Sequence, residues 1–406
     1  MRSQRLTQGG LPRSLTPRPG CRYRKLWYYG SRDRFGPKLC LDGLEPMADV
    51  KIEFGLPYGN LPWETIDVIT GTKDVGGPSP VVLYLHGGGF VACNSDVLLH
   101  SVPIPLARAG AQSFSMNYPL APDQQFPAAV ISTIRALAWV KMRTGAKEVV
   151  LMGDSAGGCI ASTTAAILSS PDLLKQLQLC DGCEHPLTDW DVPTVSQLVS
   201  IYGVLDRQGW SSDPDPVTGV KPTMRWNDKI GAAVLQFCLR CYGADKVSDT
   251  ALLGGKCILS DFTAEDLRNM PDTLLICGSS DPLIFGNRQE CARIGAIEGR
   301  SIRLIEYPAH HAFIGFPIAW NFQWQQDTWP AFLEIVGFLG EFLRCPWDPD
   351  MLGGSGRDRE GVGAAETRAH LLASPLGCSS PPVQVFRKSR WRPIGRDTSA
   401  STGCSR

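Results

Sequence analysis

The sequence predicts an α/β protein with a mostly parallel central sheet and helices on both of its faces. From about residue 50 to residue 345, short apolar runs of strand length alternate with longer stretches of helical periodicity. This alternation is typical of parallel strands joined by helices. Glycines and polar residues directly follow several of the apolar runs. In such sheets the reactive groups lie at the carboxyl ends of the strands.

The expected elements follow one another along this region. Strands are expected at the start of segments 80–90, 111–122, 148–158, 196–206, 272–283 and 301–313. Helices are expected in 95–110, 126–145, 156–170 and 329–344. Residues 207–250 fit the sheet poorly, because Pro, Asp and Gly crowd their first half and a helical pattern fills the second. We expect this segment to form a cap over the site.

Charge divides the chain into three parts. Forty Lys and Arg balance forty Asp and Glu over the 406 residues, which argues against a chain-wide nucleic-acid binder. Residues 1–46 nevertheless carry a net charge of +7 and residues 347–406 one of +3, so residues 47–346 carry −10. We expect one folded domain over 47–346 between two basic extensions, both of them disordered. An oligomeric state is not predicted.

The N-terminal extension leaves two interpretations open. It has no acidic residue before Asp33 and is rich in Arg, Gly, Pro and Ser. Transit peptides of mitochondria or plastids are likewise rich in Arg and Ser and poor in acidic residues. The alternative is an extension ahead of a start at Met47, which would leave the protein in the cytoplasm. No run of about 18 apolar residues occurs, so no integral membrane span is expected.

The fourteen cysteines are scattered, with two CxxC pairs at Cys180/Cys183 and Cys238/Cys241. Four thiolates can hold a structural zinc ion. The long separation of the pairs and the helical pattern around the second one disfavour this. We therefore expect free thiols, with no metal and no organic cofactor.

The strongest motif is GDSAGG, Gly153 to Gly158, between an apolar strand pattern and a run of small residues. A G-x-S-x-G sequence in that context forms a sharp strand-to-helix turn that presents the serine as a nucleophile. Ser155 is thus the candidate nucleophile, and Asp154 is expected to hydrogen-bond locally. A glycine-rich turn with an ordinary serine is the alternative.

A second glycine-rich motif, HGGGF from His86 to Phe90, ends an earlier strand. Consecutive glycines allow the backbone N–H groups to approach and bind an anion. Together with the N–H of Ala156, after the nucleophile, this loop predicts an oxyanion hole. His86 is expected to orient the loop rather than to act as a base.

A serine nucleophile needs a base, and the base needs a carboxylate that fixes its tautomer. Asp281 follows one expected strand, and His310 and His311 follow another. The chain order Ser155, Asp, His is the order of this class of sheet. Asp206 is a rival carboxylate, and both histidines remain candidates at this point.

Six motifs in order resemble the hormone-sensitive-lipase family of α/β-hydrolases. They are HGGGF, NYPLAPDQQFPAAV, GDSAGG, YGVLD, the DPL triplet and HHAF, spread over roughly residues 55–345. The resemblance implies the α/β-hydrolase fold with a small helical cap from 47–65 and 207–250. The chain departs from it where Pro119 follows Tyr118; the family arginine missing there is structural.

The resemblance also implies a triad of Ser155, Asp281 and His311, since His311-Ala312-Phe313 matches the family's H-x-F segment. By the same matching Gly88, Gly89 and Ala156 supply the oxyanion hole. The implied activity is hydrolysis of small carboxylic esters, of short to medium chain length. The aromatic Phe90, Trp210 and Trp226 are expected to line an apolar pocket. Two alternatives stay open: an amide or N-acetyl deacetylase of the same mechanism, and a non-catalytic ligand-binding protein of the same fold.

Overall fold

A computed structural model describes most of the central part of the chain. The described residues are 49–72, 79–99, 101–178, 191–207, 226–244 and 252–314, together with Ala331, Ile335, Gly337 and Leu339. The two basic extensions, 1–46 and 347–406, lie outside the described residues. So does most of the helix expected in 329–344, although its four described residues are helical.

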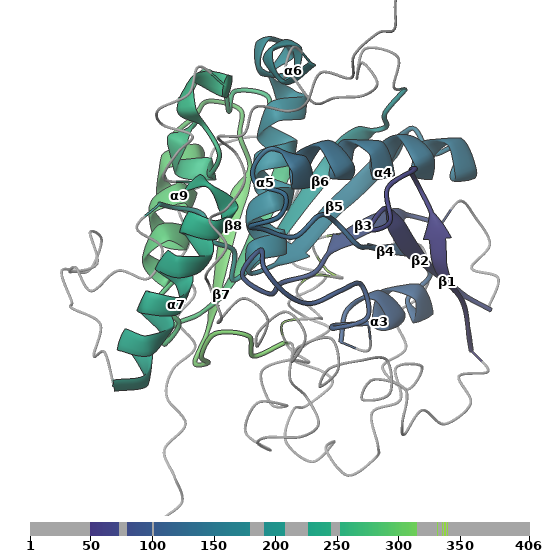
Figure 1. Ribbon diagram of the computed structural model, residues 1–406, viewed down its shortest axis with the longest axis horizontal. Helices are drawn as coiled ribbons and strands as arrows, with labels where there is room; N and C mark the ends of the chain where they lie inside the picture. The colour runs from purple at the N-terminus through teal and green to yellow at the C-terminus, as the bar shows by residue number, and fades with distance from the viewer. Residues whose placement is uncertain are drawn as a thin grey trace, which may run out of the picture.

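The described residues form one eight-stranded sheet in the order β1-β2-β4-β3-β5-β6-β7-β8 (Figure 1). Its strands are β1 (Val50–Pro57), β2 (Thr65–Gly71), β3 (Val81–Leu85), β4 (Gln112–Met116), β5 (Glu148–Asp154), β6 (Thr194–Ile201), β7 (Asp272–Gly278) and β8 (Ile302–Tyr307). Neighbours from β4 to β8 pair in parallel, whereas β2 is antiparallel to both β1 and β4. The expectation of a mostly parallel sheet is confirmed.

Helices cover the sheet on both sides (Figure 1). The α-helices are α3 (Pro103–Arg108), α4 (Ala128–Thr144), α5 (Ala156–Ser169), α6 (Pro171–Gln178), α7 (Trp226–Tyr242) and α9 (Ile284–Gly295), and two 3-10 turns are η3 (Leu252–Gly255) and η4 (Leu259–Asp261). Helix α5 packs on β3, β5 and β6, with α4 alongside it, and α3 packs on β2 and β4. Helices α6 and α9 were not anticipated from the sequence.

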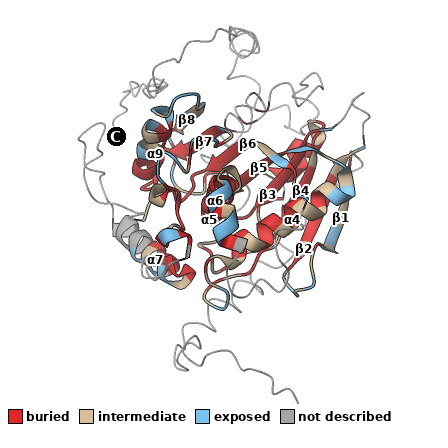
Figure 2. Ribbon diagram, turned by 90° about the horizontal axis from the view of Figure 1, so that it is seen from above, coloured by how far each residue is buried: buried red, intermediate tan, exposed pale blue. Residues whose placement is uncertain are grey.

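The central strands are buried on both faces (Figure 2). All five residues of β3, VVLYL, are buried, and so are six of the seven in β5. Continuous apolar runs are what a parallel sheet covered by helices on both faces requires. This buried centre is the rigid support from which the glycine-rich turns emerge.

Residues 47–65 differ from their expected place in a cap. Val50–Pro57 forms β1 at the edge of the sheet, where Ile52 pairs with Ile69 and Glu53 with Val68. Apart from the buried Val50, the residues of β1 are exposed or only partly buried, as expected for a strand at the edge of a sheet. A segment that pairs with β2 is part of the sheet, so this part of the expected cap is wrong.

The helix expected over 95–110 is shorter than its apolar pattern. It begins at Pro103, which occupies the first turn. Proline lacks an N–H and disfavours helical backbone in the residue before it, so it starts helices rather than continuing them. Residues 96–99 form turns instead. Within the described ranges, no helix is long and apolar enough to cross a membrane.

Candidate active site

Ser155 lies at a sharp turn between β5 and α5. Its backbone has φ +50° and ψ −115°, a conformation that a residue with a side chain adopts only under strain. The Ser155 N–H donates a hydrogen bond to the carbonyl oxygen of Ile201 at the end of β6, with an N···O distance of 2.9 Å. The turn is therefore held by the neighbouring strand, and the serine side chain is only partly buried.

The two glycines of G-x-S-x-G are required by close backbone contacts. A Cβ atom at Gly153 would lie 2.4 Å from the carbonyl oxygen of Gly157. One at Gly157 would lie 2.2 Å from the carbonyl oxygen of Leu85 and 2.5 Å from that of His86. Helix α5 can thus begin against the end of β3 only because these residues have no side chain.

His311 connects the serine to a buried carboxylate. The Ser155 Oγ lies 3.1 Å from His311 Nε2, and His311 Nδ1 lies 2.8 Å from Asp281 Oδ2. The three residues follow β5, β8 and β7, and Asp281 is buried. His310 is exposed. The tertiary structure thus brings together the three residues that the sequence analysis grouped, and it gives the contact with Ser155 to His311.

The charges around His311 favour its protonated form. Burial by itself lowers the pKa of His311, but the carboxylate of Asp281, through its charge and its hydrogen bond, outweighs this and raises the pKa above its ordinary value. Asp154 adds a smaller contribution of the same sign. The ring of Tyr202 packs edge-on against His311, with centroids 5.0 Å apart. Tyr202 belongs to the YGVLD segment, but nothing in the sequence indicated this contact.

The HGGGF segment, called the oxyanion loop here (His86–Phe90), lies directly beside the serine. A Cβ at Gly87 would stand 3.2 Å from the Cβ of Ser155. Gly88 and Gly89 have φ values of +116° and +62°, which glycine adopts without strain. In the part of the chain that the structure describes, the N–H groups of Gly88, Gly89 and Ala156 donate no hydrogen bond. They are free to bind a negatively charged oxygen.

His86 is deeply buried at the start of the oxyanion loop. Its ring stacks on Tyr118 at 4.3 Å between centroids, and its Nδ1 lies 2.6 Å from the carbonyl oxygen of Gly87. Burial lowers the pKa of His86 to about 4, so the ring is neutral at physiological pH. The hydroxyl of Tyr118 donates a hydrogen bond to the His86 carbonyl oxygen, at an O···O distance of 2.6 Å. These contacts fit a role in shaping the loop.

Of the three aromatic residues expected in the pocket, Phe90 lies among the described side chains. Phe90 is 1% exposed and stacks on Tyr242 of α7, with centroids 4.2 Å apart. It therefore joins the oxyanion loop to α7 and does not present a free apolar surface, which corrects its expected place in a pocket lining. Trp210 and the side chain of Trp226 lie outside the described residues.

Helix α7, from the expected cap segment, packs on the oxyanion loop. A Cβ at Gly89 would come within 2.8 Å of the Cys238 sulfur. The carbonyls of Tyr242 and Cys241 accept hydrogen bonds from the backbone of Phe126 and the side chain of Gln125. The remainder of 207–250 that would complete a cap, 208–225 and 245–250, lies outside the described residues.

Asp154 binds groups from distant parts of the chain. Its Oδ1 accepts hydrogen bonds from the Tyr84 hydroxyl and from the Gly87 N–H. The donor–acceptor distance is 2.6 Å in both. These donors come from β3 and the oxyanion loop, about 70 positions earlier. The expected local bonding is therefore only part of its contacts, since a hydrogen bond with its own backbone is present as well. Parallel pairing of β3 with β5 brings the distant donors to this edge of the sheet.

No cluster of three or more potential metal ligands occurs among the described residues. Cys238 and Cys241 of the second CxxC pair lie in α7 and are not joined in a disulfide. The first pair, Cys180 and Cys183, lies outside the described residues.

Comparison with known proteins agrees with the fold. Residues 82–315 match the profile of a family described as alpha/beta hydrolase fold. Probable carboxylesterase 6 of Arabidopsis thaliana is 40% identical over 118 residues, which are 26% of this chain and 34% of that protein. Esterase LipI of Mycobacterium tuberculosis is 36% identical over 121 residues, 28% of this chain and 36% of that protein. The matches thus span about a third of these relatives' length.

Solved structures share the fold. Esterase B from Lactobacillus Rhamnosis has a TM-score of 0.56 at 18% identity, covering 78% of this chain and 93% of that chain. Carboxyl esterase 2 from Tuber melanosporum has a TM-score of 0.53 at 17% identity, covering 75% and 95%. The chain belongs to the α/β-hydrolase fold, in its hormone-sensitive-lipase-like family.

Proposed function

We propose that the protein is a serine hydrolase that cleaves carboxylic esters through an acyl-enzyme. The observation that carries the proposal is the chain of contacts from Ser155 Oγ through His311 to Asp281. A serine, a histidine and a buried carboxylate in this arrangement form the constellation that activates a serine hydroxyl. The esterases among its relatives support the same reaction class.

The mechanism has two steps. Ser155 attacks the ester carbonyl while His311 Nε2 accepts its proton, and Asp281 stabilises the imidazolium that forms. The N–H groups of Gly88, Gly89 and Ala156 bind the oxyanion, each donor lowering the barrier by about 3 kcal/mol. His311 then protonates the leaving alcohol. In the second step His311 activates a water molecule, which releases the acid from Ser155.

The proposed acyl group is short to medium in length. Helix α7 packs directly against Gly89, and Phe90 is occupied by its contact with Tyr242. Both contacts occupy the α7 side of the oxyanion loop, and on this ground we propose a compact acyl group.

The test uses the full chain and a series of p-nitrophenyl esters from acetate to laurate. Wild-type protein should hydrolyse the shorter members and react with a fluorophosphonate, and Ser155→Ala should lose both properties while remaining folded. Equal labelling of wild type and Ser155→Ala would instead leave the ligand-binding alternative. Hydrolysis of aryl acetamides in preference to the matched acetates would move the assignment to a deacetylase.

A further inference from the structure

We propose that Asp154 is a positioning residue, whose carboxylate holds the oxyanion loop against the nucleophile by binding the N–H of Gly87, with Tyr84 as its second donor. The inference rests on the proposed hydrolase function and adds a residue that acts through the loop. Asp154 contacts neither the ester nor the reacting atoms in this role.

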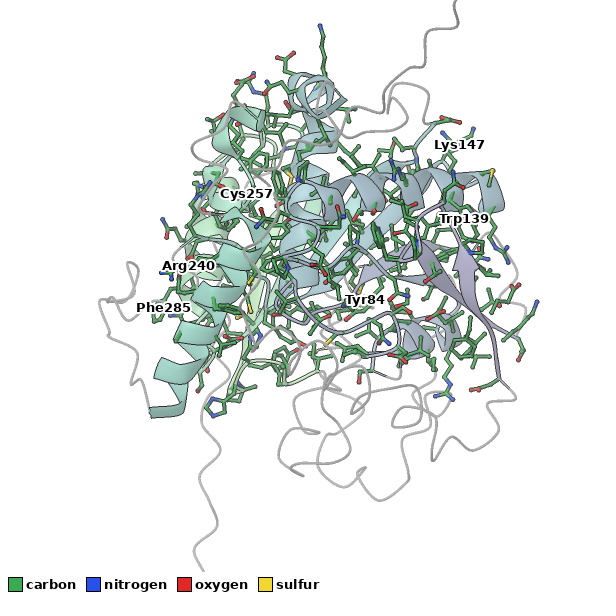
Figure 3. The ribbon with its side chains drawn as sticks, in the orientation of Figure 1. Tyr84, Trp139, Lys147, Arg240, Cys257 and Phe285 are labelled. Carbon is green, nitrogen blue, oxygen red and sulfur yellow. The ribbon has the colours of Figure 1, made fainter. Side chains whose placement is uncertain are left out.

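The carboxylate is placed where the two halves of the site meet. Asp154 is the last residue of β5, directly before Ser155, and is 5% exposed. Its Oδ1 receives both the Gly87 N–H and the Tyr84 hydroxyl at 2.6 Å. Tyr84 lies on β3 in the interior of the molecule (Figure 3). Hydrogen bonds to an ionised acceptor are shorter and stronger than those between neutral groups.

This contact fixes the beginning of the oxyanion loop. Gly87 immediately precedes the two residues whose N–H groups are proposed to bind the oxyanion, and both of those have left-handed backbone angles. The far end of the loop is held separately by the stacking of Phe90 on Tyr242. Without the carboxylate, the Gly87 N–H loses its partner and the first half of the loop is held less firmly, by the contacts of His86 with Tyr118 that remain. A displacement of about 1 Å in a catalytic group can reduce the rate about 100-fold.

The charge of Asp154 also acts on the catalytic base. Burial raises the pKa of Asp154 to about 6, although the hydrogen bonds from Tyr84 and Gly87 oppose this. The carboxylate is therefore ionised at neutral pH and raises the pKa of His311. The titratable groups that face it from the surrounding elements are Tyr84, Cys93, Tyr118, Tyr202 and His311. Of these only His311 becomes positively charged near neutral pH.

Two substitutions separate the hydrogen bond from the charge. Asp154→Ala removes both, whereas Asp154→Asn keeps a carbonyl oxygen that accepts two hydrogen bonds. Asp67→Asn is the matched control, because Asp67 is also buried and also accepts from a backbone N–H, that of Gly55, and a hydroxyl, that of Ser95. It belongs to β2, outside the proposed site.

The experiment measures kcat and KM for p-nitrophenyl butyrate and amide hydrogen exchange of the segment 84–92. Asp154→Ala should lower kcat about 10- to 100-fold with KM changed by less than about threefold, and should speed the exchange of this segment. Asp154→Asn should keep kcat within about threefold at about pH 8 and retain slow exchange. The acid limb of its kcat/KM profile should move to lower pH, since the neutral amide no longer raises the pKa of His311. Asp67→Asn should change none of these quantities.

Two results would overturn the inference. The first is a folded Asp154→Ala protein with wild-type kcat and wild-type exchange in 84–92. The second concerns Asp154→Asn, which decides the question if Asp154→Ala does not fold. If Asp154→Asn loses more than tenfold in kcat, or if the acid limb of its kcat/KM profile stays where it is in wild type, the proposal is contradicted. If the wild type shows no hydrolysis that depends on Ser155, the hydrolase function fails instead, and the exchange of 84–92 still tests the contact with Gly87.

Discussion

The Nδ1 atom of His311 lies 2.8 Å from Oδ2 of Asp281, which stands 30 positions earlier in the chain. The two residues follow neighbouring parallel strands, β8 and β7. In the proposed mechanism this carboxylate fixes which ring nitrogen of His311 carries the proton, so that Nε2 can accept a proton from Ser155. Because Asp281 raises the pKa of His311, this relationship also sets the pH at which the base becomes active.

Asp281→Asn should therefore change both rate and pH dependence. We expect kcat to fall by about 10³- to 10⁴-fold, because the amide favours the wrong tautomer. The acid limb of kcat/KM should move to lower pH, since the base is active only when deprotonated and the variant lacks the charge that raises its pKa. A pH–rate profile measures both effects. Asp206→Asn, at the rival carboxylate, should keep near-wild-type activity, and the opposite ranking of the two variants would transfer the role to Asp206.

The two adjacent histidines should behave differently. His311→Ala removes the group 3.1 Å from Ser155 Oγ and should reduce kcat by at least about 10³-fold. His310 is exposed, and His310→Ala should stay within about threefold of wild type, as most surface substitutions do. The rates with p-nitrophenyl butyrate decide the matter. If His310→Ala is inactive toward p-nitrophenyl butyrate while His311→Ala remains active, the role of the base belongs to His310.

Gly157→Ala should destabilise the fold at the junction of β3 and α5. An added Cβ would lie 2.2 Å from the Leu85 carbonyl oxygen, so the strand end and the helix must separate. The expected loss of about 3 kcal/mol from overpacking exceeds the gain of about 1 kcal/mol from helix propensity.

Gly145→Ala is the control for that measurement. Gly145 ends α4 with φ +71° and has open space around it, so only backbone strain of about 1 kcal/mol applies. Urea unfolding measures both variants. A smaller loss for Gly157→Ala than for Gly145→Ala would show that the junction tolerates a methyl group.

The pH dependence of stability should reveal the buried charge of Asp154. Its folded-state pKa, about 6, lies above the ordinary value of 3.8. The folded protein thus holds more protons than the unfolded chain between these values, and stability declines as pH rises through that window. Asp154→Asn lacks this loss. The melting temperature of Asp154→Asn minus that of wild type should therefore increase as the pH is raised from about 4 to about 6. If this difference in melting temperature is the same at every pH, the raised pKa of Asp154 is contradicted.

Most of the central sheet was predicted from the sequence, but its β1–β2 edge was not. Strands β3 to β8 were each expected from a short apolar pattern, which at β3, β5 and β7 leads into a turn that contains glycine or small polar residues. Strand β1 was expected in a cap, because the family resemblance implied a partly N-terminal cap; it pairs with β2 instead. The expected helix over 95–110 was too long, because the apolar pattern outweighed the stop signal of Pro103.

By itself the sequence determined the fold class and the residue types of the site, because strand-terminal glycines, a serine in G-x-S-x-G and a carboxylate–histidine order are local patterns. Only the tertiary structure decided which groups touch: that Phe90 packs on α7 and that Asp154 accepts the Gly87 N–H. His311, the histidine that the family resemblance implied, lies beside Ser155. The physical reason is the parallel pairing of the strands. It brings the ends of distant segments to one edge of the sheet, and no local pattern encodes the register of that pairing.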